Sequence, residues 1–188
     1  AFLGWVAAHV RDLAFSNQTM IVWAGVLFLA AMGFLDDYIK VRKHHNRGIF
    51  WKQKNYITML ASFIMAWVLV VGTGISETIS VTRPDVGIEV PTIVWVLWAG
   101  AIIWATTNAV NLTDGLDGLA AGSALMGFGA FALIGYWLFR NPDVYTGAVN
   151  PLDMGVMAAG FAGACLGFLW WNAAPARIFM GDVGALAI

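Results

Sequence analysis

Long runs of apolar residues alternate with short polar segments along this chain. Four windows carry no Asp, Glu, Lys or Arg: residues 55–76, 90–113, 118–139 and 154–176. Each is long enough for the ~20 residues that a helix needs to cross a ~30 Å hydrocarbon layer. A fifth window, residues 13–35, is polar only from Ser16 to Thr19, so its spanning part is about residues 20–35. The pattern predicts five membrane-spanning helices.

The two ends of the chain are also apolar. Residues 1–10 resemble the tail of a helix, and residues 183–188 resemble the start of one. We therefore expect an all-α, polytopic helix bundle with five full spans and two partial ones, forming a single integral membrane domain over residues 1–188. No basic segment precedes Ala1, so no cleavable signal peptide is visible. The sequence has the pattern of an interior part of a longer protein.

The composition supports lipid as the solvent. The chain is 60% hydrophobic and 11% charged, whereas a soluble domain has about 45–50% apolar and about 25% charged residues. This argues against a soluble globular domain. The single cysteine, Cys165, lies inside an apolar window and is expected to be a small buried hydrophobe. Gly163 and Gly167 have the spacing typical of close packing between membrane helices.

The basic residues predict the orientation of the chain. Because consecutive spans alternate in direction, residues 36–54, 106–117 and 172–182 lie on one side, and residues 11–19, 77–89 and 140–153 on the other. The first side carries Lys40, Arg42, Lys43, Arg47, Lys52, Lys54 and Arg177; the second carries Arg11, Arg83 and Arg140. Positive residues concentrate in cytoplasmic loops, so we expect the first side to face the cytoplasm.

The motif-like carboxylates all fall on this predicted cytoplasmic side. They are the pair Asp36 and Asp37, the pair Asp114 and Asp117, and Asp182 in the segment FMGDVG. The loops of the other side carry scattered acids without such surroundings: Asp12, Glu77, Asp85, Glu89, Asp143 and Asp153. Convergence on one side predicts a single site built from several helices.

The segment NAVNLTDGLDGLA, residues 108–120, suggests the chemistry of that site. Asn108, Asn111, Asp114 and Asp117 recur at intervals of three, and Gly115 and Gly118 favour a helix that ends or bends there. Carboxylates next to hydrocarbon are expensive unless they are paired, hydrated or bound to a cation. Mg²⁺ prefers oxygen ligands and often takes one or two carboxylates together with substrate phosphates.

The basic segment between residues 40 and 54 suits phosphate. Such a cluster also fixes topology and attracts anionic lipid heads, and both roles stay open. His44 and His45 lack a spaced partner and are interpreted as loop residues. Carboxylates, Mg²⁺ and lysines at a membrane surface favour phosphoryl transfer to or from a lipid. The rival class, an ion or proton transporter, would place acids in mid-span, where the four long windows have none.

Three segments in the right order identify a family resemblance. FLDDYIKVRKHHNRGIFWKQK (34–54), NAVNLTDGLDGLA (108–120) and WNAAPARIFMGDVGALA (171–187) resemble the signatures of the polyprenyl-phosphate N-acetylhexosamine-1-phosphate transferases. Within this family, DDYIK, KQK and NLTDGLDGLA are most similar to the bacterial phospho-N-acetylmuramoyl-pentapeptide transferases. The resemblance covers nearly the whole chain.

The resemblance implies a bacterial inner-membrane enzyme, multi-pass and typically of ten spans, with its active site facing the cytoplasm. Such enzymes move phospho-MurNAc-pentapeptide from UDP-MurNAc-pentapeptide to undecaprenyl phosphate, giving lipid I and UMP for peptidoglycan synthesis. The alternative is a related transferase for UDP-GlcNAc or another UDP-sugar, and a remoter one is a non-enzymatic membrane transport protein. The implied partners are the two substrates and the lipid bilayer, without nucleic acid; a homodimer stays open.

The resemblance also implies residue roles. Asp36 and Asp37 would lie beside the lipid phosphate and the Mg²⁺ cofactor, and Asp182 would be the main metal ligand. The nucleotide-sugar site would be lined by Asn111, Asp114, Asp117 and Asn172, with Phe179 stacking on uracil. Lys40, Lys52 and Lys54 would bind substrate phosphates, with Lys54 and Lys52 neutralising the diphosphate. The family pattern places a histidine-rich motif after Ile188 and a Gly/Pro/Thr-rich stretch before Ala1.

Two of these roles have a simpler alternative. Asp182 could cap a helix that begins near Val183, since aspartate is a favoured helix cap. Asp36 need not act as a base. A phosphate monoester with a second pKa near ~6 is already largely dianionic at neutral pH, as phosphorylated side chains are.

Overall fold

The computed structural model describes residues 1–10, 16–42, 49–79, 87–144 and 150–188. Its helices are α1 (Phe2–His9), α2 (Asn17–Arg42), α3 (Trp51–Thr73), α4 (Thr92–Thr113), α5 (Leu119–Arg140), α6 (Pro151–Asn172) and α7 (Gly181–Ala187). The predictions for Arg11, Asp12, Lys43, His44, His45, Arg47, Arg83 and Asp85 fall outside the described residues.

The all-α prediction is confirmed in its main features. Five helices, α2 to α6, are long and apolar enough to cross a membrane, and α1 and α7 are the two short terminal helices. Among the described residues, the departure from helix is a pair of short strands in the 77–89 connection. There β1 (Thr78–Ile79) and β2 (Ile88–Glu89) pair antiparallel, with Thr78 opposite Glu89.

Two helix boundaries differ from the windows of apolar sequence. Helix α2 already begins at Asn17, because the polar residues Gln18 and Thr19 are buried against protein and need no water. Helix α6 ends at Asn172, four residues before the apolar window does. Hydropathy marks where lipid is tolerated, whereas local packing and capping decide where the helix stops.

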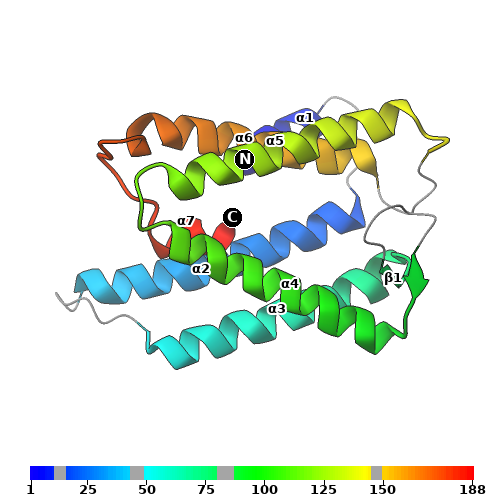
Figure 1. Ribbon diagram of the computed structural model, residues 1–188, viewed down its shortest axis with the longest axis horizontal. Coiled ribbons are helices and arrows are strands. Elements are labelled where there is room, and N and C mark those ends of the chain that lie inside the picture. The colour runs from blue at the N-terminus through cyan, green and yellow to red at the C-terminus, as the bar shows by residue number, and fades with distance from the viewer. Residues whose placement is uncertain (11–15, 43–48, 80–86, 145–149) are drawn as a thin grey trace.

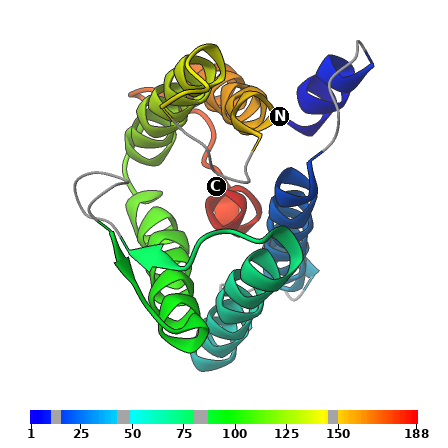
Figure 2. The same cartoon turned by 90° about the vertical axis from the view of Figure 1, so that its right-hand side faces the viewer.

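The long helices run side by side, and the short α7 lies among them (Figures 1 and 2). Helices α3 and α4 pack together, as do α5 and α6, while α7 contacts both α2 and α4. The end of α2, the start of α3, the α4–α5 turn and the segment before α7 all lie at one end of the bundle, on the left of Figure 1. This is the arrangement expected from the alternation of spans.

Close helix contacts use other glycines than the predicted pair. A Cβ on Gly33 would collide with the backbone of Asp182, and one on Gly135 would collide with Pro151 and Gly155 of α6. Gly163 and Gly167 have open space beside them, so the prediction that they mediate close packing was wrong. Which glycines face a neighbour depends on the rotation of each helix. Cys165 is buried, as expected.

The structure also corrects the interpretation of Asp153 as a scattered loop acid. Its side chain is fully buried in the first turn of α6. It accepts hydrogen bonds from Trp5 Nε1 at 2.7 Å, Ser16 Oγ at 2.6 Å and Thr19 Oγ1 at 2.6 Å. His9 Nε2 lies 3.2 Å away. Asp153 therefore joins α1, α2 and α6 at the end of the bundle opposite to the predicted site.

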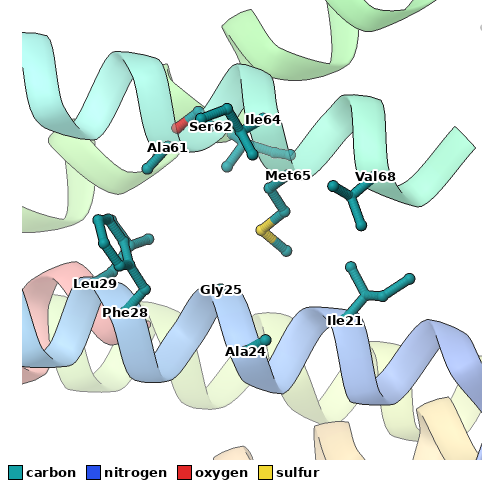
Figure 3. A pocket seen from close by; sticks show the side chains of 11 residues that line it. Ile21, Ala24, Gly25, Phe28, Leu29, Ala61, Ser62, Ile64, Met65 and Val68 are labelled. Carbon is teal, nitrogen blue, oxygen red and sulfur yellow. The ribbon is translucent and has the colours of Figure 1, made fainter. Parts of the chain in front are cut away.

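An apolar pocket of about 240 Å³ lies between α2 and α3. Met65 reaches from α3 toward Gly25 on α2 and lies across its middle (Figure 3). The polar side chain in its lining is Ser62, whose hydroxyl donates to the carbonyl oxygen of Thr58. None of the predicted site residues lines this pocket. It is a hydrophobic groove within the spanning region, separate from the charged residues.

Candidate functional site

Three segments far apart in sequence bring charged side chains to one point. The last turns of α2 carry Asp36, Asp37 and Lys40, and the two aspartates face Lys40 because they precede it by four and three residues. The first turn of α3 supplies Lys54, and the first turn of α7 supplies Asp182. Gly33, one turn before the aspartates, allows the backbone at Asp182 to approach α2.

The two lysines bridge the carboxylates. Lys40 Nζ lies 2.6 Å from Asp36 Oδ2 and 3.5 Å from Asp37 Oδ1, and it also donates to Asp182 Oδ2. Lys54 Nζ lies 2.5 Å from the other oxygen, Asp182 Oδ1, and 3.9 Å from Asp36 Oδ2. The backbone amide of Ile49 donates to Asp36 Oδ1. The five side chains thus form one network, which we call the carboxylate–lysine cluster.

Burial makes these ion pairs necessary. Asp36 is 3% exposed and Asp182 is 9% exposed, and an unpaired charge at that depth is strongly destabilising. Burial by itself would raise the pKa of Asp182, but hydrogen bonds with Asp36, Lys40 and Lys54, together with the positive charge of Lys54, outweigh it. The pKa of Asp182 is held well below its usual range. Asp182 is therefore ionised at neutral pH.

The donor set fits a hard divalent cation. Carboxylate oxygens of Asp36, Asp37 and Asp182 all lie within 4.8 Å of one another. Mg²⁺ binds carboxylate oxygen and completes its octahedron with water or phosphate oxygen. The predicted ligands are therefore close enough together to share one ion, although Mg²⁺ dependence stays a prediction.

The start of α7 is held by Asp37 of the cluster and by one further carboxylate, Asp114. Asp37 Oδ2 accepts a hydrogen bond of 3.2 Å from the amide of Val183. The backbone amides of Gly181 and Met180 form hydrogen bonds with the carboxylate of Asp114. Burial, together with the charge of Asp182, nevertheless raises the pKa of Asp114, against the lowering effect of these amides.

This arrangement contradicts the alternative in which Asp182 caps α7. The N-cap residue is Met180, whose own side chain forms no cap hydrogen bond. The carboxylate of Asp182 points to the two lysines instead. A first-turn amide of α7 is taken by Asp37. Asp182 is thus oriented toward the cluster.

The α4–α5 turn confirms the predicted break in the helix. Helix α4 ends at Thr113, with Asp114 as its C-cap, and α5 begins after Gly118, whose φ is +72°. A left-handed conformation of this kind favours glycine because it has no Cβ. The polar repeat is therefore split. Asn111 stays on the last turn of α4, and Asp117 lies in the turn.

A second group of predicted residues ties this turn to the segment before α7. Asn172 is 1% exposed; its Oδ1 accepts from the amide of Gly118 at 3.1 Å, and its Nδ2 donates to the carbonyl oxygen of Ile178 at 2.9 Å. Asp117 Oδ2 accepts from the amide of Ala176 at 3.0 Å. Both side chains hold the 173–180 segment against the α4–α5 turn.

The remaining predicted residues lie at the same end without a direct contact to the cluster. Phe179 is 57% exposed beside the start of α7. Lys52 is exposed, with its ammonium 5.5 Å from the centre of the Trp51 ring. Sequence reasoning missed Gly33 and the Ile49 amide. Gly33 had a usable signal, because it lies three residues before Asp36 on the same helix face.

Comparison with known proteins adds a family. Residues 19–188 match the model of a family described as glycosyl transferase family 4. Over 100% of its length the chain is 43% identical to a phospho-N-acetylmuramoyl-pentapeptide-transferase of Frankia casuarinae. Over 98% of its length it is 40% identical to the proteins of that name from Mycobacterium avium and Mycobacterium tuberculosis.

The match covers only part of these relatives. The chain spans 57% of the Frankia casuarinae protein and 56% of each mycobacterial one. The cluster and the α4–α5 turn lie within the residues that match the family model.

Proposed function

This chain belongs to glycosyl transferase family 4, and we propose that its protein makes lipid I. In this reaction, phospho-MurNAc-pentapeptide moves from UDP-MurNAc-pentapeptide to undecaprenyl phosphate, and UMP is released. The name shared by the relatives supports this reaction. The observation that carries it is the carboxylate–lysine cluster, which joins Asp36, Asp37 and Asp182 to two lysines at one end of an apolar bundle.

The cluster suits a reaction between two phosphates at a membrane surface. Lys40 and Lys54 carry ammonium groups that can donate to phosphate oxygens, and both sit at the ends of spanning helices. A lipid phosphate stays at the interface because its chain is apolar and its head is charged. Phosphoryl transfer needs mainly positioning and neutralisation of charge.

Asp182, Asp36 and Asp37 would hold a Mg²⁺ ion. When bound, this ion would supply positive charge beside the diphosphate. Lys54 reaches Asp182 from the α3 side, and Lys40 reaches it from α2. The two lysines would therefore meet the phosphates from different sides of the metal ligand.

The chemical step needs no base from the protein. An oxygen of the undecaprenyl phosphate dianion attacks the phosphorus atom next to the sugar, and the bond from that phosphorus to the bridging oxygen breaks. UMP leaves with that oxygen and its electron pair. The attacking oxygen carries no proton at neutral pH, since the second pKa of a phosphate monoester is near ~6. Asp36, buried against Lys40, therefore serves to position charge.

The nucleotide-sugar would lie between the α4–α5 turn and the segment before α7. Asn111, Asp114 and Asp117 offer amide and carboxylate groups there, and the exposed ring of Phe179 is available for stacking on uracil. Asn172 would act by positioning this segment, since its amide is already used by Gly118 and Ile178. Lys52 would reach the diphosphate only if it left the Trp51 ring.

We place the protein in the bacterial cytoplasmic membrane with the cluster facing the cytoplasm. Five apolar helices and the distribution of Lys and Arg support this placement. UDP-sugars are charged and do not cross a bilayer unaided, so a site that uses them must face the compartment where they are made. A homodimer stays a prediction.

The test is turnover by the purified intact protein in detergent. It is given Mg²⁺, undecaprenyl phosphate and one UDP-sugar at a time, and release of UMP is measured. We expect release with UDP-MurNAc-pentapeptide and not with UDP-GlcNAc. The reverse result would assign a related sugar-1-phosphate transferase. No release with any UDP-sugar from folded protein would contradict a transferase and favour a non-enzymatic membrane role.

A further inference from the structure

The ammonium group of Lys40 contacts all three aspartates that could share a metal ion. Its Nζ contacts Asp36 Oδ2 at 2.6 Å and Asp37 Oδ1 at 3.5 Å, and it donates to Asp182 Oδ2. These are the three residues whose carboxylate oxygens cluster within 4.8 Å. Lys40 contacts all three, whereas Lys54 contacts two of them.

The charges explain why a cation is needed at this point. Three carboxylates and two ammonium groups leave the cluster with a formal charge of −1. Without Lys40, three buried or half-buried carboxylates would share one ammonium group. Like charges at this distance repel strongly in a medium of low dielectric constant. Lys40 therefore stabilises the junction of α2 and α7.

The same contacts put Lys40 in competition with a metal. An ammonium group has three N–H donors and no lone pair, so it cannot join the coordination shell of an ion. Mg²⁺ requires its oxygen ligands at about 2.0–2.1 Å. An ion held between Asp36 Oδ2 and Asp182 Oδ2 would lie against the ammonium group that now contacts both oxygens, and the two positive charges would repel each other. Lys54 is less affected, because it holds the other oxygen of Asp182.

We infer that Lys40 is a tethered substitute for the metal ion. It holds the three aspartates together when no divalent cation is bound, and it leaves them when one binds. This inference rests on the proposed function for the identity of the cation. It goes further by giving Lys40 two successive positions, first on the carboxylates and then free to bind phosphate.

The position of Lys40 permits this movement. Its side chain is 34% exposed, compared with 17% for Lys54 and 4% for Asp36. It is attached to the helix that carries Asp36 and Asp37, so a displaced ammonium group stays within reach of the site. With a divalent cation added, the formal charge of the cluster would change from −1 to +1. The cluster would then attract a phosphate that it previously repelled.

The first test measures binding of Mn²⁺, a paramagnetic substitute for Mg²⁺, in the absence of substrates. Intact wild-type protein in detergent is compared with Lys40→Met, and free Mn²⁺ is followed by electron paramagnetic resonance. We expect Lys40→Met to bind Mn²⁺ about tenfold more tightly or better, an effect within the usual range of couplings between ligands. Arg42→Met is the control, because Arg42 is an exposed cation at the end of the same helix.

The outcomes separate the inference from the proposed function. Unchanged or weaker Mn²⁺ binding by folded Lys40→Met would overturn the inference even if the wild-type protein released UMP. Tighter binding would support it even if no UDP-sugar were turned over.

A second test uses only the wild-type protein, so it applies even if the Lys40→Met variant does not fold. Wild-type protein is labelled with an amine-reactive reagent in chelator or in excess Mg²⁺, and modified lysines are quantified by mass spectrometry. We expect Mg²⁺ to raise the labelling of Lys40 several-fold, because its ammonium group is released from the carboxylates. Lys52, which is exposed beside Trp51, is the internal reference and should not change. Equal labelling of Lys40 in both conditions would contradict the inference.

Discussion

Gly33 on α2 lies directly against the backbone of Asp182, so closely that no side chain fits between them. This contact brings the first turn of α7 to the helix that carries Asp36 and Asp37. The hydrogen bond from the Val183 amide to Asp37 lies beside it. The position of Asp182 relative to the other carboxylates therefore depends on the absence of a Cβ atom at residue 33.

Replacing Gly33 with alanine should separate α7 from α2. The added methyl group meets backbone, which cannot rotate away, so we expect a loss of about 1–3 kcal/mol of stability, as for other overpacked sites. A shift of about 1 Å at Asp182 can reduce turnover by roughly 10²-fold. Thermal unfolding in detergent and UMP release measure the two effects. Gly163→Ala is the control, since Gly163 has open space and should keep both properties.

Asp182→Asn should remove metal-dependent transfer while the protein stays folded. Asparagine keeps the shape of the side chain but loses the charge that holds a hard cation. We expect UMP release to fall roughly 10²-fold or more, the size of effect seen when a group that stabilises transition-state charge is removed. Asp143→Asn, in the connection that follows α5 and therefore beyond the end of this helix that is remote from the α4–α5 turn, should behave like the wild type. Nearly normal activity of Asp182→Asn would exclude Asp182 as a main metal ligand.

Asn172→Ala should loosen the segment that carries Phe179. The substitution removes the hydrogen bonds of the buried Asn172 side chain to the amide of Gly118 and the carbonyl oxygen of Ile178, each of which contributes about 0.5–1.5 kcal/mol to stability. We expect a lower unfolding temperature and a higher KM for the UDP-sugar. Asn141→Ala serves as the control, because the Asn141 side chain donates to the carbonyl oxygen of Trp137, one turn back at the other end of α5. An unchanged KM would mean that this segment does not contact the nucleotide-sugar.

The orientation of the chain can be tested with single cysteines. In a Cys165→Ala background, Thr113→Cys and Ala176→Cys should resist an impermeant thiol reagent added to intact cells. Asp143→Cys should react with it. The reason is the excess of Lys and Arg on the predicted side of the membrane that holds residues 36–54, 106–117 and 172–182. Labelling of Thr113→Cys or Ala176→Cys from outside would contradict the prediction that the cluster faces the cytoplasm.

The sequence by itself determined which segments are helices and which motifs share an end of the bundle. Windows free of charge, such as residues 118–139, contain no ionised side chain that would need water in mid-span, so each one predicts a spanning helix. Because successive spans reverse direction, the connections alternate between the two ends of the bundle, which places Asp36, Asp114 and Asp182 at the same end. Gly118 also marked the break after α4, since a positive φ favours a residue without a Cβ.

Only the tertiary structure decided which side chains meet. Hydropathy does not distinguish Gly33, which contacts Asp182, from Gly163, which faces open space. Asp153 looked like a loop acid, and its burial against Trp5 and Thr19 depends on how α1 and α2 dock on α6. The sharing of three aspartates by Lys40 likewise requires α7 to insert beside α2. Helix formation is local in the sequence, whereas helix rotation and docking depend on packing between segments more than a hundred residues apart.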